Sequence, residues 1–286
     1  MIRFSSAYEL SIALRAPRQA GESIALVPTM GNLHAGHLSL VDIARQRADK
    51  VGVSIFVNPM QFDQAGDLTN YPRTLEADLA LLGEHEVDYV FTPTVSEIYP
   101  EGQQSTTRVV APGISSDLEG ASRTGHFEGV ATVVAKLFNI VQPGMAIFGE
   151  KDFQQLLVIR KMVTDLNFPI RIYSGPTVRE ADGLAMSSRN SRLTASQRRL
   201  APQLYRLLQR IEGLLREGAK NFSTMEEKAL ALLATRAFEP DYLTIRNART
   251  LAPATAEDDE LVVLAAVRLG EVRLIDNIPV SLKNGD

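Results

Sequence analysis

The feature that most constrains the fold is the succession of an apolar run, a helical pattern and a second apolar run. Residues 23–27 suit a buried strand, residues 38–48 repeat apolar side chains at helical spacing, and residues 51–57 suit another buried strand. Two strands joined by a helix form a βαβ unit, in which the strands are parallel. The start of the chain therefore predicts an α/β fold built on a parallel sheet.

The alternation of strands and helices continues to about residue 173 and then changes. Helices are expected over 75–86, 127–141 and 153–166, and strands over 87–91, 145–148 and 170–173. Beyond Gly175-Pro176, helices are expected over 194–217 and 223–238, and consecutive strands over 241–246, 261–267 and 272–275. Strands without intervening helices favour a separate α+β domain. We predict a Rossmann-like parallel sheet of five or six strands, with helices on both faces, over residues 1–175, and a smaller α+β domain over residues 176–286.

Composition says more about the possible binding partners of the chain than about its fold. The formal net charge is −4 and no run of like charges forms a tail, so nucleic acid is not an expected partner. The chain has no cysteine, which excludes disulfides and thiolate metal sites and fits a reducing compartment. No apolar run approaches the roughly 18 residues of a membrane span, and the first residues do not form a signal peptide. We expect a cytoplasmic protein that acts on small molecules and has no membrane partner.

The turn between the first strand and the first helix predicts an anion site. The first N–H groups of a helix have no partner inside it, and the helix dipole places partial positive charge there. Gly31 and Gly36 would let an anion approach the backbone. His34 and His37 are three residues apart, so they share one face if residues 33–38 are already helical. The alternative is a pair of surface imidazoles without a ligand.

Two further groups could bind the same anion. Lys151 lies in Gly149-Glu150-Lys151-Asp152, which repeats the order of strand, glycine and helix start; the alternative is a solvated turn. Ser187, Ser188 and Arg189 carry hydroxyls and a guanidinium suited to phosphate oxygens, although a polar turn between domains would explain them as well.

Polar residues after the second strand are candidates for substrate binding. Ligands of parallel sheets bind beyond the carboxyl ends of the strands, so Asn58 and Gln61 should face the same crevice as the histidine pair. The amides of Gln61 and Gln155 could hold a hydroxylated or carboxylated substrate, although each alone could be an ordinary polar residue. His126 could be a loop ligand or a helix cap, of which we favour the structural role, and we interpret His85 as solvated.

The commoner phosphate-binding motifs are missing. The sequence has no Walker-type glycine loop, no dinucleotide-fold glycine fingerprint after the first strand and no His-Glu-x-x-His zinc site. The remaining candidates for phosphate chemistry are the histidine pair, Lys151 and the Ser-Ser-Arg loop. This set favours attack on an inner phosphate with pyrophosphate leaving, so catalysis would be mostly alignment and charge stabilisation.

Five stretches of the chain together resemble the pantoate–β-alanine ligase family: residues 28–37, 54–62, 71–74, 148–155 and 182–190. The resemblance runs nearly unbroken from Ile24 to Leu193. His34-x-x-His37 and Met186-Ser187-Ser188-Arg189, taken alone, resemble only the wider superfamily of nucleotidylyltransferases and class I aminoacyl-tRNA synthetases.

The resemblance implies an ATP-dependent condensation of (R)-pantoate with β-alanine through a pantoyl adenylate, with release of pyrophosphate and AMP. It implies catalytic roles for His34, His37 and Lys151, with His37 as proton donor. The ATP site it implies is Met30, Gly31, His34, His37, Gly149, Glu150, Lys151, Asp152, Val178, Met186, Ser187, Ser188 and Arg189. The substrate site it implies is Met30, Asn58, Gln61 and Gln155, with Gln61 also near β-alanine.

The resemblance also implies Mg²⁺ bound with ATP, a homodimer, and a C-terminal domain that closes as a lid. Asp78 is a candidate metal ligand, and the metal ligands are otherwise undetermined. Two alternatives stay open from the sequence: another nucleotidyl transferase of the same fold, and a nucleotide-sensing protein without turnover.

Overall fold

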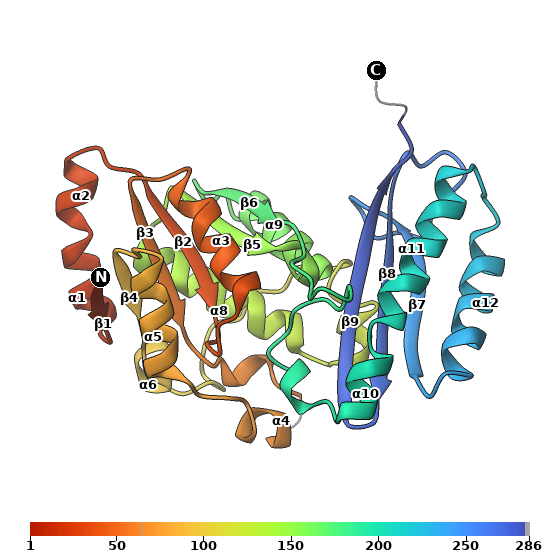
Figure 1. Ribbon diagram of the computed structural model, residues 1–286. Helices are drawn as coiled ribbons and strands as arrows, with labels where there is room; N and C mark the ends of the chain where they lie inside the picture. The colour runs from red at the N-terminus through yellow and green to blue at the C-terminus, as the bar shows by residue number, and fades with distance from the viewer. Residues whose placement is uncertain (64, 284–286) are drawn as a thin grey trace. The chain divides into compact units, whose positions relative to one another are not determined.

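The computed structural model describes residues 1–63 and 65–283, which divide into two compact units. The first unit comprises Met1–Glu150 and Gln154–Pro176. The second comprises Lys151–Phe153 and the described part of Thr177–Asp286. Each unit has its own sheet, whose strands are labelled in Figure 1.

The described part of the first unit contains a sheet of six parallel strands, in the order β1-β4-β3-β2-β5-β6. They are β1 (Ile2–Phe4), β2 (Ile24–Thr29), β3 (Lys50–Ile55), β4 (Tyr89–Phe91), β5 (Met145–Gly149) and β6 (Arg171–Gly175). The predicted parallel sheet is confirmed, and so is its first βαβ unit. Strand β1 was not predicted, because three residues are too few to show a periodic pattern.

Helices cover both faces of this sheet, as the side chains of β2 show. Ile24 and Leu26 belong to one hydrophobic cluster, whereas Ala25 and Val27 belong to another, because successive side chains of a strand point to opposite faces. The first cluster includes α1 (Ala7–Ala13), α8 (His126–Val141) and α9 (Phe153–Asp165). The second includes α3 (Ala35–Arg45) and α5 (Leu75–Glu84). The predicted helices on both faces are confirmed.

Short helical segments fill the connections of the first unit. They are α2 (Arg15–Gln19), η1 (Pro59–Gln61), α4 (Ala65–Thr69), α6 (Val95–Ile98) and α7 (Glu119–Ser122). The predicted loop region from 95 to 125 is irregular apart from α6 and α7. No helix among residues 1–63 and 65–283 is both long and apolar enough to cross a membrane.

The second unit starts with η2 (Glu150–Asp152), shared with the first, and continues with an antiparallel sheet in the order β7-β8-β9. Its other elements are η3 (Asn190–Arg192), α10 (Ala195–Leu200), α11 (Gln203–Arg216), α12 (Phe222–Ala234), β7 (Glu239–Asn247), β8 (Glu260–Leu269) and β9 (Val272–Ser281). Buried side chains of α11 and α12 pack on this sheet in one cluster. The predicted α+β organisation is confirmed.

Two of the differences between the second unit and the prediction have a clear physical reason. The single helix expected over 194–217 is wrong: it is divided into α10 and α11 at Pro202, which has no N–H for a helical hydrogen bond. Strand β9 runs on past Ile275, where we expected it to end. The apolar pattern stops at Asp276 and Asn277, but both side chains are buried and hydrogen-bonded, so the strand continues.

Candidate active site

The turn before α3 is held by a buried carboxylate. Asp78 of α5 is 2% exposed and accepts the backbone N–H groups of Asn32 (2.9 Å) and Leu33 (2.8 Å). Gly31 has a φ of +81°, and a Cβ there would lie 3.0 Å from Asp78 Oδ2. Only glycine combines this backbone conformation with so close an approach. Both oxygens of Asp78, the candidate metal ligand, are therefore engaged by the turn.

The two histidines cap the start of α3. Nδ1 of His34 accepts the N–H of Gly36 (3.1 Å), and Nδ1 of His37 accepts the N–H of His34 (3.3 Å). The N–H of Gly36, one of the first N–H groups of the helix, is thus used by His34. An accepting Nδ1 leaves the proton of a neutral imidazole on Nε2. With ring centroids 4.1 Å apart, the pair supplies two neighbouring Nε2–H donors.

The side chain of Gln61 is oriented by Asn58. Nδ2 of Asn58 donates to Gln61 Oε1 (3.0 Å), and Oδ1 of Asn58 accepts the hydroxyl of Tyr99 (2.7 Å). Burial raises the pKa of Tyr99, so its hydroxyl stays protonated and donates. Because Oε1 of Gln61 is occupied, its Nε2 is left to donate to a ligand oxygen.

The backbone of Gln61 is fixed by the start of α8. Its carbonyl oxygen accepts hydrogen bonds from His126 Nδ1 (2.8 Å) and Arg123 Nη2 (3.1 Å). A Cβ on Gly129 would lie 2.4 Å from the carbonyl oxygen of Met60, so the backbones of α8 and η1 are in direct contact. The structural interpretation of His126 is supported, and sequence reasoning missed Arg123 and Gly129.

Two neighbouring glutamines at the start of α9 differ in role. Gln154 is buried and organises the long loop: Oε1 accepts the N–H of Glu119 (3.1 Å), and Nε2 donates to the carbonyl oxygens of Ile114 and Asp117 (both 2.8 Å). Gln155, the candidate pantoate ligand, is half-buried and makes no side-chain hydrogen bond within the described residues. Sequence reasoning missed Gln154, because nothing in the chain order links it to residues 114–119.

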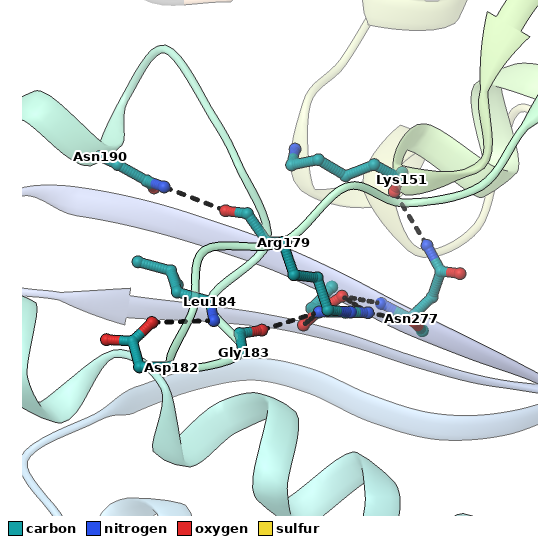
Figure 2. A network of polar contacts seen from close by, with 9 residues as sticks. Lys151, Arg179, Asp182, Gly183, Leu184, Asn190 and Asn277 are labelled. Atoms are coloured by element: carbon teal, nitrogen blue, oxygen red, sulfur yellow. Dashed lines mark hydrogen bonds and ion pairs between the residues drawn. The ribbon is translucent and has the colours of Figure 1, made fainter. Parts of the chain in front are cut away.

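Lys151 lies in the second unit, as do Val178 and the 186–189 loop. Its carbonyl oxygen accepts the Nδ2 of Asn277 at 2.9 Å (Figure 2). Its side chain forms no ion pair with any residue that the structure describes. The lysine is thus anchored through its backbone, and its ammonium charge acts on the Asp276 carboxylate without forming an ion pair with it.

The Met186–Arg189 loop directly follows a short hairpin. The N–H of Met186 donates to the carbonyl oxygen of Val178 (2.9 Å), and Oγ of Ser187 accepts the N–H of Arg189 (3.2 Å). Nδ2 of Asn190 donates to the carbonyl oxygen of Ala185 (3.0 Å), as Figure 2 shows. The loop is therefore an ordered turn. The hydrogen bond from the N–H of Arg189 to Ser187 Oγ fits the alternative interpretation of Ser187 as part of a polar turn.

The sequence-predicted residues thus fall into two sets, each within one unit. The first set comprises Met30, Gly31, His34, His37, Asn58, Gln61, Gly149, Glu150 and Gln155, and the second comprises Lys151, Asp152, Val178, Met186, Ser187, Ser188 and Arg189. Glu150 of the first set accepts the hydroxyl of Ser174 at 2.7 Å, which ties it to β6.

The parallel sheet, the histidine pair that caps α3 and the Met-Ser-Ser-Arg loop define the class: an α/β enzyme of the nucleotidylyltransferase type. Comparison with known proteins narrows this class. The family model described as pantoate-beta-alanine ligase matches residues 3–279. The chain belongs to this family and is an enzyme of the ligase class.

Individual relatives agree with the family assignment. A pantothenate synthetase of Azotobacter vinelandii is 55% identical over 282 residues, which cover 99% of this chain and 100% of the relative. The crystal structure of pantothenate synthetase from Thermus thermophilus has a TM-score of 0.90 and 47% identity, covering 97% of this chain and 99% of that one. The Francisella tularensis pantoate-beta-alanine ligase, solved with beta-gamma ATP and beta-alanine, has a TM-score of 0.83 and 33% identity, covering 100% and 99%.

Proposed function

We propose that the chain joins (R)-pantoate to β-alanine at the expense of ATP, in two steps. A carboxylate oxygen of pantoate attacks the α-phosphorus of ATP, the bond from that phosphorus to the bridging oxygen breaks, and pyrophosphate leaves. The amine of β-alanine then attacks the carbonyl carbon of pantoyl adenylate. AMP leaves, the nitrogen loses a proton, and pantothenate is formed.

The histidine pair is the observation that carries this proposal. Negative charge moves onto the departing pyrophosphate as the α-phosphorus is attacked, and fixed donors aimed at such charge lower the barrier. His34 and His37 supply two Nε2–H donors from rings 4.1 Å apart, each fixed by a backbone hydrogen bond at Nδ1. We assign His37 as a donor of an Nε2–H hydrogen bond to the leaving group, with His34 and Lys151 also stabilising its charge.

The other residues bind and orient the substrates. The free Nε2 of Gln61 supports binding of a pantoate or β-alanine oxygen, and the unengaged amide of Gln155 supports binding of pantoate. Met30 and Asn58 complete the substrate site. ATP binds along Met30, Gly31, Gly149, Glu150, Asp152, Val178, Met186, Ser187, Ser188 and Arg189. Residues 1–175 form the nucleotide- and pantoate-binding domain, and residues 176–286, the last three outside the described part, form the lid.

Mg²⁺ accompanies ATP in this proposal. The described residues contain no group of three His, Cys, Asp or Glu side chains that could hold a metal ion, and both oxygens of Asp78 accept backbone N–H groups. This donor set fits an ion held mainly by triphosphate oxygens and water, where it would neutralise phosphate charge. We also propose a cytoplasmic homodimer, its compartment supported by the absence of cysteine and its assembly to be measured by light scattering.

Pyrophosphate release tests the proposed function. The purified chain with ATP and Mg²⁺ should release pyrophosphate when pantoate is added, and pantothenate should form when β-alanine follows. ATP binding without pyrophosphate release would support the nucleotide sensor instead, and release with another acceptor would support a different nucleotidyl transferase. His37→Ala should slow pantoyl adenylate formation by about 100-fold while the fold persists, since one charge-stabilising donor is worth that much.

A further inference from the structure

Lys151 belongs to the second unit although only Glu150 separates it from the end of β5 in the first. Its backbone is fixed by β9, because the amide of Asn277 donates to the carbonyl oxygen of Lys151 at 2.9 Å (Figure 2). Asn277 is 2% exposed, so the donor end of this hydrogen bond is shielded from water. The lysine therefore depends for its position on a residue 126 positions further along the chain.

An ion pair between the buried Asp276 and the half-buried Arg179 fixes Asn277 in turn. Asp276 accepts two hydrogen bonds from the guanidinium of Arg179, at 2.7 and 2.9 Å, and one from the backbone N–H of Asn277, at 2.8 Å. Arg179 also donates to the carbonyl oxygen of Asn277 at 3.2 Å. A two-pronged pairing of guanidinium and carboxylate permits a single geometry, so the backbone at Asp276 and Asn277 is held in one place.

The same guanidinium holds the hairpin that leads to the Ser187-Ser188-Arg189 loop. Arg179 donates to the carbonyl oxygen of Gly183 at 3.2 Å and lies 3.5 Å from the centre of the Tyr205 ring. Gly183 has a φ of +96°, and a Cβ there would lie 2.7 Å from Tyr205 Cδ1. Figure 2 shows the hydrogen bond between Arg179 and Gly183. The turn at Gly183 thus lies between this arginine and the Tyr205 ring.

We propose that Asn277 is a positioning residue for this reaction, which together with the Arg179–Asp276 pair keeps Lys151 in register with the 186–189 loop. Asn277 acts only through Lys151. The two phosphate-binding elements of the second unit then meet the triphosphate of ATP as one rigid group. This inference rests on the proposed role of Lys151 in binding and stabilising ATP phosphates.

A double-mutant cycle between Asn277→Ala and Lys151→Met tests the inference, with single-turnover pyrophosphate release measured against ATP and against pantoate. Asn277→Ala should lower kcat/KM for ATP about 10-fold and change the pantoate KM less than about twofold, because misplacing a catalytic group by a fraction of an ångström costs this much. In the Lys151→Met background the same substitution should cost less than about twofold, because nothing is left to position.

Each outcome of the cycle decides between explanations. Equal losses in both backgrounds would overturn the inference, since Asn277 would then act independently of Lys151. Full activity of Lys151→Met alone would overturn the proposed role of the lysine, and the inference with it. Asn277→Asp keeps the side-chain shape but removes the N–H donor, so an Asp variant with wild-type ATP kinetics would also refute the inference.

Asn247→Ala is the matched control. Asn247 ends β7 and donates to Asp258 at 2.5 Å in a loop that contributes no proposed site residue. Thermal unfolding followed by circular dichroism should show lowered stability for both Asn→Ala variants, whereas only Asn277→Ala should change the ATP kinetics. Loss of activity in Asn247→Ala to the same extent would show that general destabilisation explains the result, and would overturn the inference.

Discussion

Gly129→Ala should displace η1, the segment that carries the proposed substrate ligand Gln61, without touching any substrate. A Cβ at Gly129 would lie 2.4 Å from the carbonyl oxygen of Met60 and 2.8 Å from the backbone nitrogen of Gln61, and both are main-chain atoms that cannot rotate away. Reaching an ordinary contact of about 3.4 Å requires η1 to move by about 1 Å. Overpacking of this kind costs about 1–3 kcal/mol in the free energy of unfolding.

The kinetic cost of that displacement should be larger than its cost in stability. A misplacement of about 1 Å typically costs about 100-fold in rate, so kcat/KM for pantoate should fall by about that factor. Pyrophosphate release at varied pantoate measures it, and urea denaturation measures stability. Gly213→Ala is the control: this helical glycine has nothing within 4 Å of a Cβ, so alanine should raise stability by up to about 1 kcal/mol and leave the kinetics unchanged. Wild-type pantoate kinetics in Gly129→Ala would refute the reasoning.

Three further outcomes are expected. Asp78→Asn places an N–H₂ group against the backbone N–H groups of the 31–33 turn, so urea denaturation should show a loss of about 1–3 kcal/mol in the free energy of unfolding. An unchanged midpoint would show that the Asp78 hydrogen bonds do not hold this turn. Tyr99→Phe leaves Oδ1 of Asn58 without its hydroxyl donor, and should raise the pantoate KM while costing about 1–2 kcal/mol in the same assay. The hydrogen bond from Arg198 lowers the pKa of Asp182 below 3.8. A carboxyl group whose pKa is lower in the folded than in the unfolded state stabilises the protein above the unfolded pKa, and this stabilisation is lost as the pH falls through the folded pKa. The wild type should therefore be more stable than Arg198→Gln by about 0.5 kcal/mol or less, because the pair is so exposed. This difference should be full at pH 7 and vanish in strong acid. An advantage that persists at pH 2 would rule out Asp182 as its source.

The parts of the fold that depend on neighbouring residues could be predicted from the sequence. The apolar runs of β2 and β3 and the periodic side chains of α3 identify a βαβ unit, because strand and helix periods differ. The histidine pair could be placed at the start of α3 for the same reason. Its proton positions could not, since they depend on which backbone N–H groups the Nδ1 atoms accept.

The parts that depend on distant partners could not be predicted. Asp276 looks like the end of a strand in the sequence, yet it is 4% exposed within one, because Arg179 supplies its hydrogen bonds from 97 residues away. Gln154 and Gln155 are residues of the same type at adjacent positions. Only the contact of Gln154 with the loop at 114–119 separates the buried structural amide from the one available to a substrate.

Lys151 shows how contacts can override chain order at a proposed site residue. By chain order it extends β5, so a reading along the sequence attaches its charge to the parallel sheet of the first unit. Its carbonyl hydrogen bond instead ties it to Asn277 of β9, and Asn277 to the arginine that clamps the turn at Gly183. A buried polar network of this kind has few satisfactory arrangements, because each member left unpaired would cost about 1–3 kcal/mol. Substitutions in β9, a strand that supplies none of the sequence-predicted site residues, should therefore change ATP kinetics before they change pantoate kinetics.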